Sequence, residues 1–164
     1  MALKDLLLPE FDREMAVTRK VLARVPEEKF GWKPHDKSMT LGRLAGHLAE
    51  IPGWVKETLT QDAFDMGGDH VPDVPATRDA VLAKFDKMVA AARPILDGAT
   101  DAQFLSTWTL KNKGQTVFTM PKVAVLRAWV LNHAVHHRGQ MAVYLRLNDV
   151  PVPSIYGPSA DEAA

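Results

Sequence analysis

The chain has 164 residues, of which 46% are hydrophobic and 24% are charged, and it contains no cysteine. These values are typical of one soluble domain, residues 1–164, with a sizeable hydrophobic core. The lack of cysteine excludes disulfides, a thiolate nucleophile and Cys-based metal sites, and it fits a reducing cytoplasm. Twenty basic and twenty acidic side chains give a formal net charge of zero. Without a cationic field, we expect no binding to nucleic acid.

The first residues, MALKDLLLPEFDREM, include acidic and basic side chains after only a few apolar positions. This pattern is neither the apolar core of a secretion signal nor a membrane span. The sequence therefore predicts a cytoplasmic protein that does not insert into a membrane.

Apolar residues recur with helical spacing in four stretches, which predicts four amphipathic helices. The expected spans are about 8–25, 41–59, 77–98 and 121–148. Ser38 or Thr40 can cap the second helix and Thr77 the third, because their side chains can accept from backbone amides of the first turn. Pro52 and Gly53 predict a kink in the second helix.

The connections between these helices differ in composition. The segment QDAFDMGGDHVPDVPATR is polar and interrupted by glycine and proline, which predicts a long loop across an end of the fold. Between the third and fourth helices, β-forming residues surround KNKG, which predicts a small hairpin. The predicted fold class is all-α: an antiparallel four-helix bundle with a small hairpin between helices three and four.

Three histidines lie close together on the last predicted helix, in NHAVHHRGQMAVYL, residues 132–145. At about 100° per residue, His133 and His137 both face the apolar side one turn apart, whereas His136 lies at its edge. This spacing allows two imidazoles to share one metal ion. A hydrogen-bonded core histidine is the commoner role for a single such residue, but two adjacent buried imidazoles leave several nitrogens to satisfy. Both interpretations stay open on spacing alone.

A metal site usually requires a third protein ligand, and the second predicted helix offers His47 in LGRLAGHLAEIPGW. His47 lies next to the apolar stripe of that helix and can point inward. His35 and His70 lie in polar, loop-like surroundings, where exposed histidine is the ordinary expectation. We assign no role to either of them.

Three further residues are weak catalytic candidates. Glu50, one turn after His47, could support a metal ligand or accept a proton, but an ordinary solvated helix residue is the favoured interpretation. Gln140 could hydrogen-bond a ligand or substrate, or merely border the core. Tyr144 could supply a hydroxyl to a pocket, although a core tyrosine is favoured.

The segment LGRLAGHLAEIPGW, followed by NHAVHHRGQMAVYLRLNDVPVPSIYGPS, resembles the DinB family of DNA-damage-inducible and YfiT-like proteins. The resemblance covers nearly the whole chain in order and length. It implies an antiparallel four-helix bundle, commonly a homodimer, with one divalent metal ion held by three histidines and completed by water. Matched position by position, the ligands fall on His47, His133 and His137, with His136 as the nearest competitor.

The resemblance leaves the reaction open. Relatives of similar fold include bacillithiol transferases and mycothiol-dependent maleylpyruvate isomerases, so the leading hypothesis is a metal-dependent S-transferase acting on a small molecule with a low-molecular-weight thiol. A metal-dependent hydrolase, in which water replaces the thiol, and a non-catalytic metal-binding stress-response domain are the alternatives. Three imidazoles accept several divalent ions. Zinc and nickel are favoured here, with iron and others left open.

Overall fold

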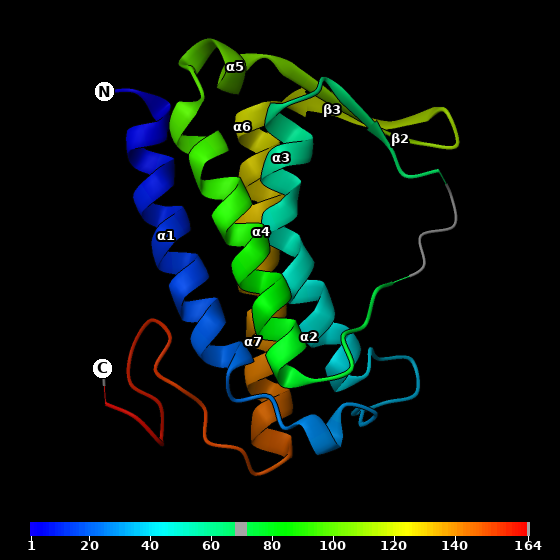
Figure 1. Ribbon diagram of the computed structural model, residues 1–164, viewed down its shortest axis with the longest axis vertical. Helices are drawn as coiled ribbons and strands as arrows, with labels where there is room; N and C mark the ends of the chain where they lie inside the picture. Colours follow the sequence, from blue (N-terminus) through cyan, green and yellow to red (C-terminus); the bar gives the residue numbers. More distant parts are fainter. Residues whose placement is uncertain (68–71, 164) are drawn as a thin grey trace.

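The computed structural model describes residues 1–67 and 72–163, and helices dominate it (Figure 1). Four helical rods lie side by side, as the sequence predicts. Two of them are single helices, α1 (Leu3–Leu22) and α4 (Arg78–Gly98). Thr77 caps α4 as expected, because its hydroxyl accepts a hydrogen bond from the Ala80 amide at 3.1 Å.

The second rod is built from α2 (Leu41–Glu50), a 3₁₀ turn (Ile51–Gly53) and α3 (Trp54–Leu59). Thr40 caps α2, since its hydroxyl accepts from the Arg43 amide at 3.2 Å. The predicted interruption at the Pro-Gly pair is confirmed. Proline removes a backbone donor there, so the α-helical hydrogen-bond ladder cannot continue unchanged.

The fourth rod runs through α6 (Lys122–Val125), a π-helical segment (Leu126–Asn132) and α7 (His133–Leu147). The sequence predicts one regular helix here, so the π-helical segment is a difference from that prediction. A π-helix forms i→i+5 hydrogen bonds and places more residues in each turn, and such segments are frequent at functional sites. Here the π segment ends immediately before the first histidine of α7.

The rods do not simply alternate in direction, which corrects the predicted antiparallel arrangement. Helix α1 runs antiparallel to α4, and α2 runs antiparallel to α7, but α2–α3 and α4 run parallel to each other, as do α1 and α7 (Figure 1). The chain leaves α3 at one end of the bundle and enters α4 at the other (Figure 1). The connection between them therefore does more than cross one end of the fold.

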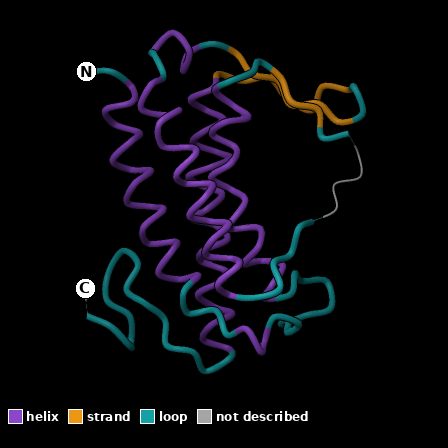
Figure 2. Tube along the Cα trace, viewed as in Figure 1, coloured by secondary structure: helices purple, strands orange, loops and turns teal. Residues whose placement is uncertain are grey.

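A small sheet lies at one end of the bundle (Figure 2), so the all-α prediction is only partly right. Strands β2 (Thr107–Asn112) and β3 (Gln115–Pro121) form the expected antiparallel hairpin after a short helix, α5 (Asp101–Leu105). Strand β1 (Ala63–Asp65) pairs in parallel with β2 and lies in the segment predicted as loop. Its three residues are too few to show a period-2 pattern.

The hairpin turn follows directly from its sequence. Lys113 and Gly114 have φ angles of 51° and 78°. Two-residue hairpin turns of the type that matches strand twist require positive φ at both central positions, and glycine adopts this conformation without steric cost.

Two apolar clusters hold the described part of the fold together. The larger one fills the space between the rods. The smaller one lies between the sheet and the bundle and is centred on Trp108, which is fully buried and donates its indole N–H to the Glu57 carbonyl at 2.9 Å. Trp54 and Trp129 pack against this smaller cluster, and Trp129 also contacts the His133 ring, so the sheet supports one side of the histidine region.

Within residues 1–67 and 72–163, every helix is too short or too polar to cross a membrane.

Candidate metal centre

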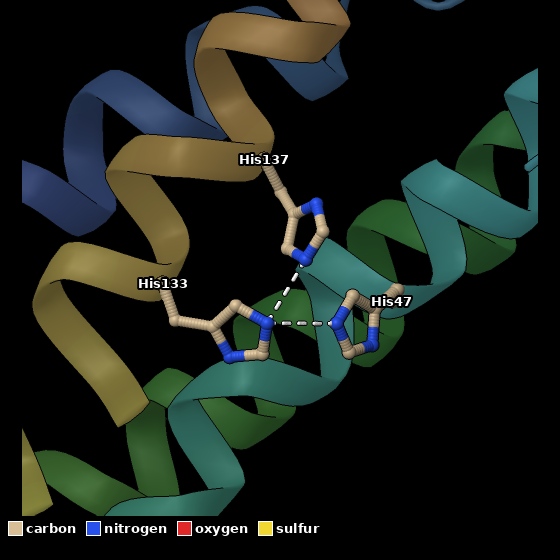
Figure 3. Close-up of side chains that lie close together, drawn as sticks. All are labelled: His47, His133 and His137. Atoms are coloured by element: carbon tan, nitrogen blue, oxygen red, sulfur yellow. Dashed lines mark hydrogen bonds between the residues drawn. The ribbon is translucent and has the colours of Figure 1, made fainter. Parts of the chain in front are cut away.

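Three histidines from two rods converge on one another (Figure 3). His47 comes from α2, and His133 and His137 come from successive turns of α7. The Nε2 atom of His133 lies 3.1 Å from that of His47 and 2.9 Å from that of His137. One ligand atom from each residue lies within 4.8 Å of the others. The structure thus brings together the three residues that helical spacing and the family resemblance selected.

Hydrogen bonds at the other ring nitrogens determine which nitrogen of each α7 imidazole carries the proton. The Nδ1 atom of His133 lies 3.3 Å from the Trp129 carbonyl oxygen, and that of His137 lies 2.7 Å from the Gln140 side-chain oxygen. Both partners are acceptors, so each Nδ1 must donate. In a neutral imidazole, Nε2 then holds a lone pair.

His47 has a similar partner, because its Nδ1 lies 3.8 Å from the Glu50 carboxylate. A proton on this Nδ1 is favoured by the negative charge, which again leaves the lone pair on Nε2. None of the three Nε2 atoms therefore carries a proton that it could donate to another Nε2. Their lone pairs face one another and repel. Nitrogen ligands about 2.0–2.1 Å from a tetrahedral zinc ion lie about 3.3 Å apart, so the spacing and the donor set both fit a metal ion.

The surroundings keep the two α7 imidazoles neutral. Burial, followed by the neighbouring histidines, lowers the pKa of His133 to about 4. Burial also lowers the pKa of His137, although its contact with Gln140 opposes the change. Neutral imidazole is the form that binds metal, so both residues are in the competent state near pH 7.

Glu50 is only 21% exposed, so the favoured interpretation as an ordinary solvated residue is wrong. Its carboxylate accepts a hydrogen bond from the Lys84 ammonium at 2.9 Å and faces His47 and Arg43. Burial raises the pKa of Glu50, but the contacts with His47 and Lys84 outweigh it and lower the pKa to about 2. Such a carboxylate is a weak proton acceptor at neutral pH, and its position suits it to orient His47.

Gln140 lies between two histidines. Its side-chain oxygen accepts from His137, and its amide nitrogen lies 3.1 Å from Nε2 of the exposed His136. The ring of His136 packs edge-on against that of His137, with centroids 4.8 Å apart, but His136 is not part of the group of three converging ligand atoms. The sequence left two roles open for Gln140: a hydrogen bond to a ligand or substrate, or a place at the border of the core. The structure contains the first kind of contact, because Gln140 hydrogen-bonds the candidate metal ligand His137.

Tyr144 lies farther along α7. Its hydroxyl donates to the Met39 carbonyl at 3.3 Å, and its ring packs edge-on against Trp32. The Tyr144 hydroxyl therefore donates its proton to a backbone carbonyl and not to any of the three histidines. His35 is exposed and accepts from the Lys37 amide at 3.1 Å, and His70 lies outside the described residues.

A pocket of about 490 Å³ opens beside His47 and Glu50. Its remaining lining residues come from α2, α3, α4, β1 and the adjoining loop segments: Arg43, Trp54, Phe64, Met66, Asp73, Lys84 and Met88. No pattern in the sequence predicts this pocket, because α4 and the β1 segment are distant from α2 in the sequence and lie beside it only in the folded chain. A pocket of this size accepts a small organic molecule, and mixed apolar and charged walls are typical of such sites.

Comparisons with known proteins identify the family and support the fold. The sequence model of the DinB family matches residues 1–164. The uncharacterized protein YrdA of Bacillus subtilis (strain 168) is 27% identical over 164 residues, which cover 98% of this chain and 92% of YrdA. The crystal structure of a DinB-like protein from Bacillus cereus ATCC 10987 superposes with a TM-score of 0.73 at 25% identity and covers 94% of this chain and 98% of that one.

A second solved structure, the DinB-like protein YjoA from Bacillus subtilis, has a TM-score of 0.71 at 15% identity and covers 92% of this chain and 96% of its own. At that identity the likeness concerns the fold alone. The match of the family over the whole length carries the assignment: the chain belongs to the DinB family.

Proposed function

We propose that His47, His133 and His137 hold one divalent metal ion and that the protein, with residues 1–164 as one functional unit, is a metal-dependent enzyme. The observation that carries this proposal is the convergence of three Nε2 atoms at contacts of 2.9 and 3.1 Å, while the opposite nitrogens face acceptors. Membership of the DinB family supports it, since the resemblance implies a three-histidine ligand set.

A bound divalent ion would act as a Lewis acid and lower the pKa of a thiol or water molecule that reaches it. Three imidazoles fill three positions of the four that catalytic zinc sites use, which leaves room for a reactant. Zinc and nickel are our leading candidates for the ion, and iron follows.

The chain's own residues would prepare the site for a small substrate. Glu50 and Gln140 orient imidazoles through their Nδ1 atoms, and the Trp129 carbonyl does the same for His133. The pocket beside His47 supplies an apolar wall against which part of a substrate can lie. These roles are positioning roles, and none of them requires proton transfer by a protein side chain.

The reaction that we favour is S-transfer, in which a low-molecular-weight thiol attacks an electrophilic carbon and its sulfur replaces a leaving group. The chain contains no cysteine, so the sulfur nucleophile must come from outside. The alternatives are hydrolysis, with water in place of the thiol, and a metal-binding stress-response role without turnover. The pocket beside His47 favours the two enzymatic hypotheses over the last one.

Two measurements test this proposal. Elemental analysis of protein purified without added metal should find one equivalent of a divalent ion per chain. The same preparation should then accelerate the reaction of glutathione or cysteine with monobromobimane more than the hydrolysis of 4-nitrophenyl acetate, and chelator-stripped protein should accelerate neither. Absence of metal after incubation with zinc or nickel contradicts the proposal, and faster ester hydrolysis favours the hydrolase.

We also propose that the protein forms a homodimer, as the family resemblance implies.

A further inference from the structure

Arg43 is a cation beside the three histidines, and its side chain makes no hydrogen bond to the residues that the structure describes. It lies one turn before His47 on α2, and its side chain is 22% exposed. Its Nη1 atom is buried and has no hydrogen-bond partner among the described residues. The carboxylate of Glu50 is 4.0 Å away, which is an ionic contact but too long for a hydrogen bond.

Lys84, the other cation that lines the pocket, is engaged. Its ammonium donates to the carboxylates of Glu50 and Asp73, each at 2.9 Å, and lies 3.3 Å from the Asp73 carbonyl. An ammonium has three donors, so these contacts use its capacity. Of the two described cations that line the pocket, only the Arg43 guanidinium therefore has donors to offer an incoming anion.

The walls of the pocket supply the other half of a recognition site. Trp54 and Phe64 pack edge to face with their ring centroids 5.3 Å apart, and Met66 and Met88 complete an apolar lining. Methionine side chains adapt to apolar groups of different shape. The pocket of about 490 Å³ thus combines an apolar wall, a guanidinium and the edge of the histidine cluster.

We infer that this pocket binds a small carboxylic acid, whose carboxylate is held by Arg43 and whose aliphatic or aromatic part lies against Trp54 and Phe64. The inference deepens the proposed function, on which it rests, by naming the substrate class of the same site. One guanidinium with unused donors matches the single charge of a carboxylate better than the double charge of a phosphate monoester. A buried donor without a partner is costly, and the exposed part of the same guanidinium side chain is available to a carboxylate in the pocket.

The test uses chelator-stripped protein, so that a metal ion cannot bind the carboxylate directly. Butanoate, 3-phenylpropanoate and 5-phenylpentanoate are each titrated by calorimetry and by NMR, together with the matching neutral amides. We expect wild-type protein to bind acid over amide by about tenfold, as for one charge-assisted hydrogen-bonded contact. Arg43→Gln should remove this preference, and Arg127→Gln, which removes an exposed arginine that pairs with Glu10, should retain it.

Three outcomes would overturn the inference: no acid preference in wild-type protein for any of the three pairs, an unchanged preference in Arg43→Gln, or tighter binding of 2-phenylethyl phosphate than of 3-phenylpropanoate. Thermal unfolding of both variants verifies that they are folded. Zinc uptake is measured in parallel. Protein that takes up no zinc but shows the Arg43-dependent preference contradicts the metal proposal and supports this one, whereas zinc uptake without acid preference does the reverse.

Discussion

The Nε2 atoms of His133 and His137 lie 2.9 Å apart, although the Nδ1 atom of each ring faces an oxygen acceptor. Both rings come from adjacent turns of α7, so the helix itself imposes their proximity. Two lone pairs at this distance repel, and burial disfavours the protonated ring that would relieve the repulsion. A cation between the two rings would remove this repulsion. Loss of either histidine should therefore weaken binding of the cation.

The first prediction concerns the ligand set. His137→Ala should lower metal affinity by more than the roughly 10–100-fold that loss of an outer partner costs, because it removes a direct ligand. His136→Ala should retain one equivalent, since His136 is exposed and its Nε2 faces Gln140 instead of the other three Nε2 atoms, although its ring packs edge-on against His137. Elemental analysis and competition with a chromogenic chelator measure both variants. Full retention in His137→Ala together with loss in His136→Ala would show that the assignment is wrong.

The second prediction concerns the orientation of His137. Gln140→Leu removes the oxygen that accepts from its Nδ1 at 2.7 Å, so the ring can rotate or change tautomer. Metal affinity should fall about 10–100-fold, as for other outer partners of ligands. Gln140→Glu keeps an acceptor and should stay closer to wild type. Because residue 140 is exposed, the melting temperature of metal-free protein should change little in either variant, and equal affinities for both would contradict this role.

The sequence predicts those features that depend on local spacing. His133 and His137 converge because they are four residues apart on one helix, and the Thr77 cap and the KNKG turn likewise depend on a few adjacent residues. Strand β1 was missed because three residues carry no periodicity. The parallel course of α2–α3 and α4 depends on how a long connection is routed, and no local pattern encodes it.

The same limit applies to the site. Glu50 looked like a solvated residue because its partner Lys84 is remote in sequence and reaches it only when α4 packs on α2. Arg43 is one turn from His47, but that its buried Nη1 finds no hydrogen-bond partner among the described residues is a property of the folded pocket. Helical periodicity thus identified residues that share a face, whereas the charge state and lining of the pocket required the tertiary structure.

The third prediction concerns a buried ion pair outside the candidate metal centre. Arg138 and Glu14 are 1% and 3% exposed, with their charged groups 2.6 Å apart, and the Tyr156 hydroxyl donates to the same carboxylate at 2.8 Å. Glu14→Ala should lower the free energy of unfolding by about 3–5 kcal/mol, because it leaves the guanidinium buried without its counter-charge. Tyr156→Phe should cost about 1.5–3 kcal/mol, because the hydroxyl also accepts from Arg138 at 2.6 Å and both of its partners are charged.

Urea unfolding measures these changes, and Glu10→Ala is the matched control, because Glu10 pairs with Arg127 at the surface. The control should change stability by no more than about 1 kcal/mol. A cost for Glu14→Ala as small as that of the control would contradict a stabilising role for the buried pair.

The fourth prediction is that the protein sediments as a homodimer at micromolar concentration, as the family resemblance implies. Analytical ultracentrifugation over a hundredfold range of concentration around about 1 μM decides it, because dissociation of a dimer follows mass action. Metal-loaded and metal-free protein should be compared, since a site within one chain predicts the same state for both. A monomer at every concentration would contradict the prediction.

The last prediction concerns acid. Each candidate ligand must be neutral to bind the ion, so protons compete with metal for the three imidazoles. The pKa of His133 is already lowered to about 4 and that of His137 is lowered in metal-free protein, and a bound ion lowers ligand pKa values further. Since the folded pKa lies below the unfolded value near 6.5, the unfolded state takes up protons first, and stability is lost as pH falls from about 6.5 through the lowered range.

Metal binding adds to this loss, because the ion stabilises only the folded chain and is released as its ligands protonate. Metal-loaded and chelator-stripped protein are therefore melted in parallel from pH 8 to pH 4. The loaded form should melt at a higher temperature at pH 8, and the difference should close toward pH 4. The Glu14 carboxylate, whose pKa is also lowered, titrates in both forms and cancels in the difference. A difference that stays constant, or that widens as pH falls, would rule out histidine ligation as the source of the stabilisation.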